Sequence, residues 1–132
     1  MLFVALFYIF CYNLSMIHEV NIKEDFPSID IAIFRIEQEI EVHKQFGEQV
    51  IKIIHGYGSH GVGGGIKEEL KHILPIWKKQ NFIYDYIKGE NFTSITLSQK
   101  RYSKNLKYLL MQDEYFDSLN KGVTIIITRS EK

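Results

Sequence analysis

The residues with the clearest chemical potential lie in a glycine-rich stretch near the middle of the chain. It contains two histidines, His55 and His60, and six glycines, Gly56, Gly58, Gly61, Gly63, Gly64 and Gly65. Glycine lets the backbone take positive φ and lets a ligand approach closely, and successive N–H groups in such turns form an anion-binding nest. Imidazole rings donate hydrogen bonds and titrate near neutral pH. The stretch therefore predicts a site for a phosphate or a similar anion.

The elements on either side of this stretch would position it well. Val50–Ile54 is short and β-branched, which indicates a buried strand. A helix is predicted to begin near Ile66, with Lys67 in its first turn and Pro75 as a kink or an end. Ligands of open α/β sheets bind at the carboxyl ends of strands, and a helix N-terminus favours phosphate. We therefore expect Lys67 to add positive charge to the site.

The remaining pattern alternates strands and helices. A strand is predicted within Ile17–Ile22, and alternation places His18 on the face of Val20, opposite Glu19. A helix begins after the N-cap Ser28, with a stripe formed by Ile29, Ile33, Ile36 and Ile40, and ends at Gly47. A strand over Phe82–Ile87, a helical segment over 99–119 and a final strand over Val123–Ile127 follow. This order predicts an α/β domain with some parallel pairing.

Composition is that of one ordinary globular domain. The chain has 132 residues, of which 45% are hydrophobic and 24% charged. The single cysteine, Cys11, excludes an internal disulfide framework and a cysteine-rich zinc site. Positive and negative charges cancel over the whole chain, yet residues 65–107 carry a net charge of +5 and residues 1–64 of −4. The basic middle indicates a local surface for anions, or otherwise a set of solvated helix faces.

The first residues form a separate apolar extension. Met1–Ile17 has no charge and lacks the basic start of a secretory signal, and its unbroken apolar run, Leu2–Tyr12, is shorter than the roughly 20 residues of a membrane-spanning helix. We interpret residues 1–15 as translated upstream of a true start at Met16, as a membrane tether, or as an appended element. Contact with a membrane is expected only if residues 1–15 are genuine. Residues 16–132 form a single domain, for which we expect a cytoplasmic location.

Two known phosphate-binding motifs fit the glycine stretch poorly. Residues 56–61 match G-x-G-x-x-G, but the glycines at 63–65 are expected to delay the helix, and no acidic residue lies between Leu74 and Gln80. A P-loop requires G-K-[ST], whereas Lys67 follows Ile66 and precedes Glu68. The dinucleotide motif stays as an alternative, and the P-loop does not.

A third pattern is a family resemblance. The stretch Ile53-Ile54-His55-Gly56-Tyr57-Gly58-Ser59-His60-Gly61 strongly resembles the I-I-H-G-x-G-x-H-G loop of the small MutS-related (Smr) domain. The strand before the loop, the glycine run into a helix and the closing strand beginning at Gly122 also match the layout of that family. The resemblance covers roughly Ile17 to Thr128, with a longer helical insertion at about 98–120.

The resemblance implies both a fold and a function. It implies a two-layer sandwich in the order β-α-β-α-β-(helical insertion)-β, with a mixed four-stranded sheet, similar to the C-terminal domain of bacterial initiation factor three. Members of the family bind nucleic acid, and several nick DNA or cleave RNA. His55, Gly56 and Gly58 take the positions of the H-G-x-G motif on the nucleic-acid face, which is tied to cleavage.

The first strand departs from the family pattern. Where the family carries D-L-H-G, this chain has Glu19-Val20-Asn21-Ile22. Glutamate replaces aspartate, and Asn21 replaces histidine. An amide donates and accepts hydrogen bonds but does not take up a proton near neutral pH, as a general acid–base residue must. The departure favours binding over cleavage.

Other groups offer weaker candidates. His55, His60 and His72 lack a cysteine or a regular ligand spacing, so we predict no metal site and no cofactor. Lys100, Arg101, Lys104 and Lys107 alternate with Tyr102 and Tyr108, a pattern that fits phosphate contact and base stacking or, more simply, a solvated helix with inward tyrosines. Trp77 is expected in the core.

The sequence thus predicts a domain that binds DNA or RNA backbone. The predicted contact residues are His55, Gly56, Gly58, Ser59, His60, Gly61, Gly63, Gly64, Lys67 and Asn21. One form of the hypothesis is a non-catalytic or weakly catalytic binder, and another is an endonuclease in which His55, assisted by Glu19 or His60, activates water or stabilises the leaving group. The alternative is a binder of a small phosphate or dinucleotide through residues 56–61.

Overall fold

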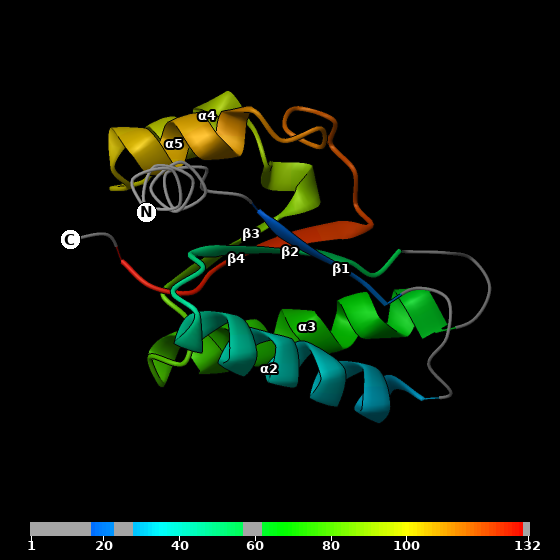
Figure 1. Ribbon diagram of the computed structural model, residues 1–132. Coiled ribbons are helices and arrows are strands. Elements are labelled where there is room, and N and C mark those ends of the chain that lie inside the picture. The colour runs from blue at the N-terminus through cyan, green and yellow to red at the C-terminus, as the bar shows by residue number, and fades with distance from the viewer. Residues whose placement is uncertain (1–16, 23–27, 57–61, 131–132) are drawn as a thin grey trace, which may run out of the picture.

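Four strands form one mixed sheet in the order β1-β2-β4-β3. The computed structural model describes residues 17–22, 28–56 and 62–130, and Figure 1 shows its layers. The elements are β1 (His18–Asn21), α2 (Ile29–Gln45), β2 (Val50–Ile54), α3 (Val62–Lys79), β3 (Asp85–Lys88), the 3-10 turn η1 (Gly89–Asn91), α4 (Ser94–Gln99), α5 (Lys104–Met111) and β4 (Val123–Ile127). Strand β1 is parallel to β2, and β4 is antiparallel to both β2 and β3. The predicted α/β class with a mixed four-stranded sheet is confirmed.

Helices α2 and α3 cover one face of the sheet (Figure 1). The apolar stripe of α2 packs with α3 and with the inward side chains of β1 and β2, among them Val20, Ile51 and Ile53. Trp77 belongs to this core, as predicted, and is buried against Phe82. Because β1 and β2 are parallel, α2 forms the crossover between them.

The opposite face of the sheet is covered by α4 and α5 (Figure 1). Val50, Ile54, Ile125 and Ile127 pack there against Phe92, Leu97, Leu106 and Leu110. Every residue of β2 and β4 is therefore buried. The predicted two-layer sandwich carries a third layer, because the segment between β3 and β4 supplies enough apolar side chains to close the second face.

Several local signals are confirmed. The Ser28 hydroxyl accepts a hydrogen bond from the Ile31 amide at 3.2 Å, which caps the start of α2. Gly47 ends that helix with φ of +77°, in the left-handed region that glycine adopts without strain. The strands Val50–Ile54 and Val123–Ile127 lie where they were predicted.

Other boundaries differ from the prediction. Helix α3 continues through Pro75 to Lys79, and the third strand begins at Asp85, because the amides of Phe82 and Ile83 bond back to the Trp77 carbonyl. Of the helical segment expected over residues 99–119, α5 forms only Lys104–Met111, and a second short helix, α4, precedes it at Ser94–Gln99. The side chains of Thr93 and Ser103 cap α4 and α5.

None of the helices in the described ranges is both long and apolar enough to cross a membrane. The predicted extension, residues 1–15, lies outside the described part of the chain.

Candidate nucleic-acid interface

The predicted loop leaves the sheet at the carboxyl end of β2. The amides of His55 and Gly56 both donate to the Gly122 carbonyl, at 2.9 and 3.0 Å. Gly56 has φ of +69°, which turns the chain away from the sheet and which a side chain would oppose. These two amides are therefore used within the fold. Tyr57, Gly58, Ser59, His60 and Gly61 lie outside the described residues.

The His55 side chain is fully buried, with 0% exposure. Its Nδ1 lies 2.6 Å from the Gly56 carbonyl oxygen, and its Nε2 lies 2.9 Å from the Thr124 hydroxyl oxygen. Since a carbonyl only accepts, Nδ1 carries the proton and Nε2 of the neutral ring accepts from the hydroxyl. Burial lowers the pKa of His55 below its ordinary 6.5. The hydrogen bond to Gly56 raises the pKa and the nearby charge of Lys67 lowers it, and burial has the largest effect.

In this arrangement the His55 side chain holds the neighbouring backbone in place. Both ring nitrogens are occupied by the protein, and the neutral ring is out of reach of solvent. The imidazole holds the Gly56 carbonyl at the point where the backbone turns toward residues 57–61. A role in activating water would require these bonds to open.

Helix α3 begins at Val62 instead of near Ile66, so the glycines at 63–65 form its first turn and do not delay it. The absence of a side chain at one of these glycines, Gly65, is explained by packing. A Cβ on Gly65 would collide with the Ile29 side chain, so glycine lets the start of α3 approach the start of α2. Gly63 and Gly64 lie in the same turn, next to the predicted loop.

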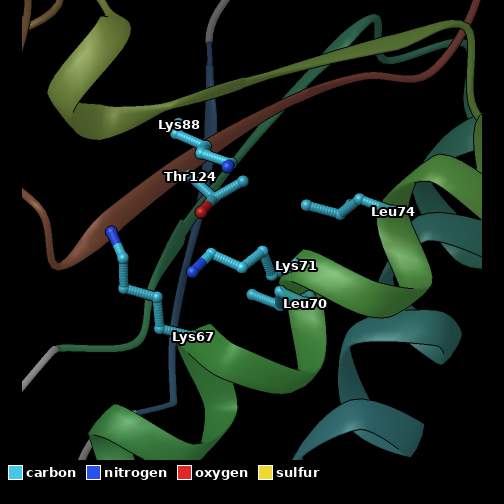
Figure 2. A pocket seen from close by; sticks show the side chains of 6 residues that line it. All are labelled: Lys67, Leu70, Lys71, Leu74, Lys88 and Thr124. Atoms are coloured by element: carbon cyan, nitrogen blue, oxygen red, sulfur yellow. The ribbon is translucent and has the colours of Figure 1, made fainter.

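A shallow pocket lies between α3 and the sheet, beside this turn. It is lined by Lys67, Leu70, Lys71, Leu74, Lys88 and Thr124, as Figure 2 shows. Lys67 and Lys71 are one helical turn apart on α3, and Lys88 ends β3. Three cationic side chains from two elements thus lie around Thr124, whose hydroxyl hydrogen-bonds the His55 ring.

One of these lysines is already paired. The Lys67 ammonium donates to the two carboxylate oxygens of Glu90 at 2.9 and 3.1 Å and to the Lys121 carbonyl at 2.7 Å. Although burial alone would raise the pKa of Glu90, the bonds to Lys67 hold it below its ordinary value. Among the described residues, Lys71 contacts the Glu68 carboxylate at 3.6 Å on the helix surface. The pocket therefore keeps an excess of positive charge.

Glu19 and Asn21 lie on the other face of the sheet from His55. Glu19 pairs at 3.2 Å with the buried Lys52 ammonium, which also bonds Asp113 at 2.8 Å. Burial alone would lower the pKa of Lys52, but the Asp113 carboxylate raises it above its usual value. Asn21 is exposed at the end of β1, in register with Ile54. The structure thus does not bring Glu19 beside His55, and His60, the other residue that the endonuclease hypothesis names as an assistant, lies outside the described residues.

The basic segment at 100–107 divides into two parts. The Tyr102 hydroxyl donates to Asp85 at 2.6 Å and Lys100 bonds the same carboxylate at 2.9 Å, so these two residues hold the segment to β3. Burial and the Asp85 carboxylate raise the pKa of Tyr102. Lys104 is exposed, and Tyr108 is 64% exposed, so the expected inward packing holds for Tyr102 alone.

Sequence reasoning missed Lys71, Lys88 and Thr124. The spacing of four between Lys67 and Lys71 was a signal that both share one helix face. Lys88 and Thr124 come from strands that are neighbours only in the folded sheet, so no local pattern pointed to them.

Comparison with solved structures identifies the fold. The chain matches the crystal structure of the Smr domain of MutS2 from Thermus thermophilus with a TM-score of 0.53 over 86% of this chain and 99% of that domain. The two sequences are 14% identical. No protein-family model and no curated protein matches the chain. The chain therefore has the fold of the Smr domain, as its glycine motif had indicated.

Proposed function

We propose that this chain is a nucleic-acid-binding domain. It contacts the phosphate backbone of DNA or RNA with the pocket lysines Lys67, Lys71 and Lys88 and with the first turn of α3. Gly58, Ser59, His60 and Gly61, which lie outside the described residues, stay predicted phosphate contacts on the strength of their sequence motif. The observation that carries the proposal is the gathering of three lysines around one pocket beside the loop that resembles the Smr motif, with Glu90 paired to Lys67 and Glu68 at 3.6 Å from Lys71.

The chemistry of this pocket suits a polyanion. Lysine ammonium groups contact phosphate as point charges, and each contact releases counterions from the nucleic acid. The first-turn amides and the dipole of α3 favour negative charge in the same direction. A backbone-binding surface of this kind reads no base sequence, so the affinity should be of the sequence-independent type.

Binding is proposed without cleavage by His55. The ring is buried and bonded at both nitrogens, Glu19 lies across the sheet, and Asn21 stands in place of the histidine of the family motif. His55 and Gly56 instead hold the entry to the loop. His60, outside the described residues, stays a predicted phosphate contact.

Binding is tested by fluorescence anisotropy with labelled single-stranded RNA, single-stranded DNA and duplex DNA. The double charge reversal Lys71→Glu/Lys88→Glu should weaken binding at least about tenfold, because both lysines lose phosphate contacts. Lys79→Glu is the matched control, since Lys79 is exposed near the far end of the same helix. Lys104→Glu/Lys107→Glu tests the other basic surface, and a larger loss there would move the interface to α5.

Two further measurements separate the rival functions. Incubation with supercoiled plasmid and with a structured RNA should leave both intact while binding persists, and nicking that is lost in His55→Ala would establish the endonuclease instead. Calorimetric titration with nucleotides tests the dinucleotide alternative, which now has a helix beginning directly after Gly61. Tight nucleotide binding without affinity for a polymer would favour that alternative.

A further inference from the structure

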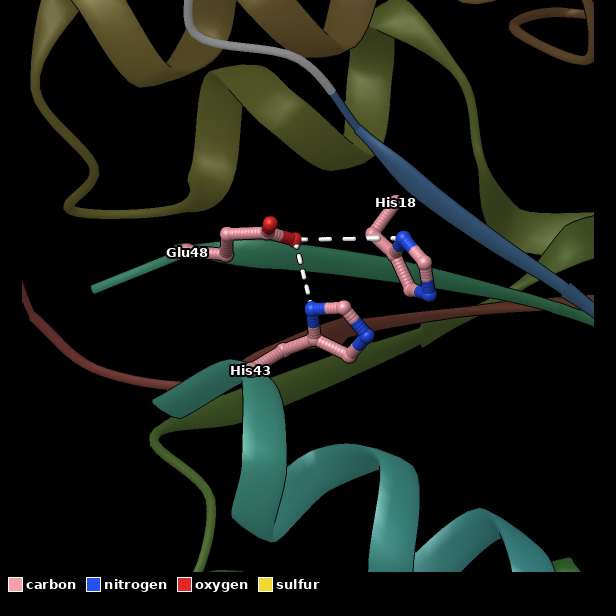
Figure 3. A group of neighbouring side chains, drawn as sticks. All are labelled: His18, His43 and Glu48. Atoms are coloured by element: carbon pink, nitrogen blue, oxygen red, sulfur yellow. Dashed lines mark ion pairs between the residues drawn. The ribbon is translucent and has the colours of Figure 1, made fainter. Parts of the chain in front are cut away.

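Two histidines and a glutamate meet at the end of the sheet opposite the loop. His18 is the first residue of β1, His43 lies in the last turn of α2, and Glu48 precedes β2 (Figure 3). His18 pairs with Ile51 in the parallel register, so this group lies about 13 Å along β2 from His55. The cluster is therefore separate from the proposed interface.

The potential ligand atoms of these three side chains lie within 4.8 Å of one another. One oxygen of Glu48, Oε2, is 2.9 Å from His43 Nδ1 and 3.9 Å from His18 Nδ1. Nitrogen and oxygen ligands of one tetrahedral zinc ion lie about 3.4 Å apart, given bonds of about 2.1 Å. The two observed separations lie on either side of this value.

A fourth side chain sets which ring nitrogens face Glu48. Glu39 Oε2 is 3.1 Å from His43 Nε2 and 3.5 Å from His18 Nε2. Arg35 holds the other oxygen of Glu39 at 2.8 Å, and although burial alone would raise the pKa of Glu39, Arg35 and His43 hold it below its usual value. Because an ionised carboxylate only accepts, Glu39 favours a proton on His43 Nε2, and a neutral ring with its proton there has Nδ1 available to bind a cation beside Glu48.

His43 Nδ1 contacts Glu48 closely but without the geometry of a hydrogen bond. His43 Nδ1 is buried and makes no hydrogen bond, although the Glu48 oxygen is 2.9 Å away. His43 Nδ1 and the Glu48 oxygen are therefore close enough to share a cation, while their contact lacks hydrogen-bond geometry. The His18 ring stacks on His43 with centroids 3.5 Å apart and presents its own Nδ1 to the same oxygen. A shared cation would satisfy all three groups.

We propose that His18, His43 and Glu48 bind a divalent transition-metal ion of the zinc class. Two imidazole nitrogens and one carboxylate oxygen form a borderline donor set, which suits Zn²⁺ and is poor for Mg²⁺ or Ca²⁺, whose preferred ligands are all oxygens. Glu39 acts as the outer carboxylate that orients both rings, an arrangement common behind metal-bound histidines. His18 and Glu48 are 33% and 37% exposed, so solvent reaches the site and can supply the remaining ligand.

The proposed ion would join three elements. Its ligands come from the start of β1, the end of α2 and the segment before β2. Gly47, in its left-handed conformation, brings Glu48 back under the end of α2, where the Glu48 amide bonds the His43 carbonyl at 2.9 Å. The site would therefore tie the crossover helix to the sheet.

The test is a calorimetric titration of the tag-free, chelator-treated chain with Zn²⁺ and with Co²⁺. We expect one ion per chain, visible absorption bands from the cobalt form, and a melting temperature that rises with zinc. His43→Ala and Glu48→Gln should each lower zinc affinity by more than the loss for Glu39→Gln, which should be about 10–100-fold. Glu48→Gln keeps the shape of the side chain, so it remains informative if His43→Ala is poorly folded. His72→Ala is the control, because His72 is an exposed histidine on α3.

The outcomes decide the proposal. One-to-one binding that is lost in Glu48→Gln and retained in His72→Ala supports it. No saturable zinc binding, or binding that persists unchanged in Glu48→Gln and His43→Ala, overturns it. Binding of nucleic acid is expected to be the same in these variants, so the result is independent of the proposed function.

Discussion

The Nε2 atom of His55 accepts a hydrogen bond from the Thr124 hydroxyl at 2.9 Å, and both side chains are buried. Thr124 also lines the pocket that contains Lys67, Lys71 and Lys88. This bond connects β4, near the end of the chain, to the first residue after β2. The position of the loop entry therefore depends on the last strand as well as on the glycines.

Removal of the Thr124 hydroxyl should destabilise the domain. Thr124→Val keeps the shape of the side chain but leaves His55 Nε2 buried without a donor, at a cost of about 1–3 kcal/mol in the free energy of unfolding. Urea unfolding monitored by circular dichroism measures this change. Ser98→Ala, on the exposed surface of α4, should change stability by less than about 0.5 kcal/mol. Equal stability of Thr124→Val and the parent chain would contradict the assigned bond.

Stability should fall as the pH is lowered through 6.5. Burial holds the pKa of His55 below its ordinary 6.5, so between these two pKa values the unfolded chain binds a proton that the folded chain does not. The free energy of unfolding should therefore decrease with falling pH, by at most about 1.4 kcal/mol per pH unit from this group. The loss ends once the folded ring itself is protonated.

Comparison with His55→Gln isolates this contribution. Glu39, Asp85 and Glu90, whose folded pKa values are lowered from ordinary values of 4.5, 3.8 and 4.5, lose their contributions at more acidic pH. Unfolding should be measured from pH 7.5 to 5. A pH dependence in His55→Gln as steep as in the parent would show that other groups carry it.

Gly89 should not tolerate a side chain. A Cβ at this position would overlap the Asn120 carbonyl and lie 2.7 Å from the Val123 carbonyl oxygen, and backbone atoms of this kind have no room to move aside. Gly89→Ala should lower stability by about 3 kcal/mol. Gly47→Ala has space, with its nearest atom on Arg129 at 3.6 Å, and should cost only the left-handed strain of about 1–2 kcal/mol. Thermal melts of the two variants compare these costs, and the reverse ranking would contradict the packing of η1 on β4.

Asp85 should anchor the third layer to the sheet. Lys78, Lys100 and Tyr102 all bond its carboxylate, and although burial alone would raise the pKa of Asp85, these bonds lower it. Asp85→Asn should reduce stability by about 2–3 kcal/mol and increase hydrogen exchange in α4 and α5 before the rest of the domain. Glu69→Gln, on an exposed part of α3, is the control. Unchanged exchange in α4 and α5 would mean that apolar contacts alone hold that layer.

Local signals predicted much of this fold. The β-branched run at Val50–Ile54, the serine cap at Ser28 and the glycine at Gly47 each depend on interactions within a few residues, which a linear pattern contains. The third layer was missed because α4 and α5 are too short to show strong periodicity. Their apolar residues can be recognised as core residues only in the folded domain, where they pack on the second face of β2 and β4.

The candidate sites likewise combine features that the local sequence predicted with contacts between distant segments that it did not. The glycine motif indicated the place of the loop, but burial of the His55 ring depends on Thr124, 69 residues further along the chain. His18 was correctly placed on the face of Val20, yet nothing in its surroundings indicated that His43 and Glu48 would meet it. The end of α2 and the start of β1 become neighbours only through parallel pairing with β2.

The most direct test of the proposed function is the salt dependence of binding to single-stranded RNA. The slope of log Kd against log salt concentration should become shallower by about 1.4 in Lys71→Glu/Lys88→Glu, since each lost phosphate contact on a single strand removes about 0.7. Lys79→Glu should keep the slope of the parent chain. A parent chain whose affinity is flat with salt, or a double variant with an unchanged slope, would contradict phosphate contact at this pocket.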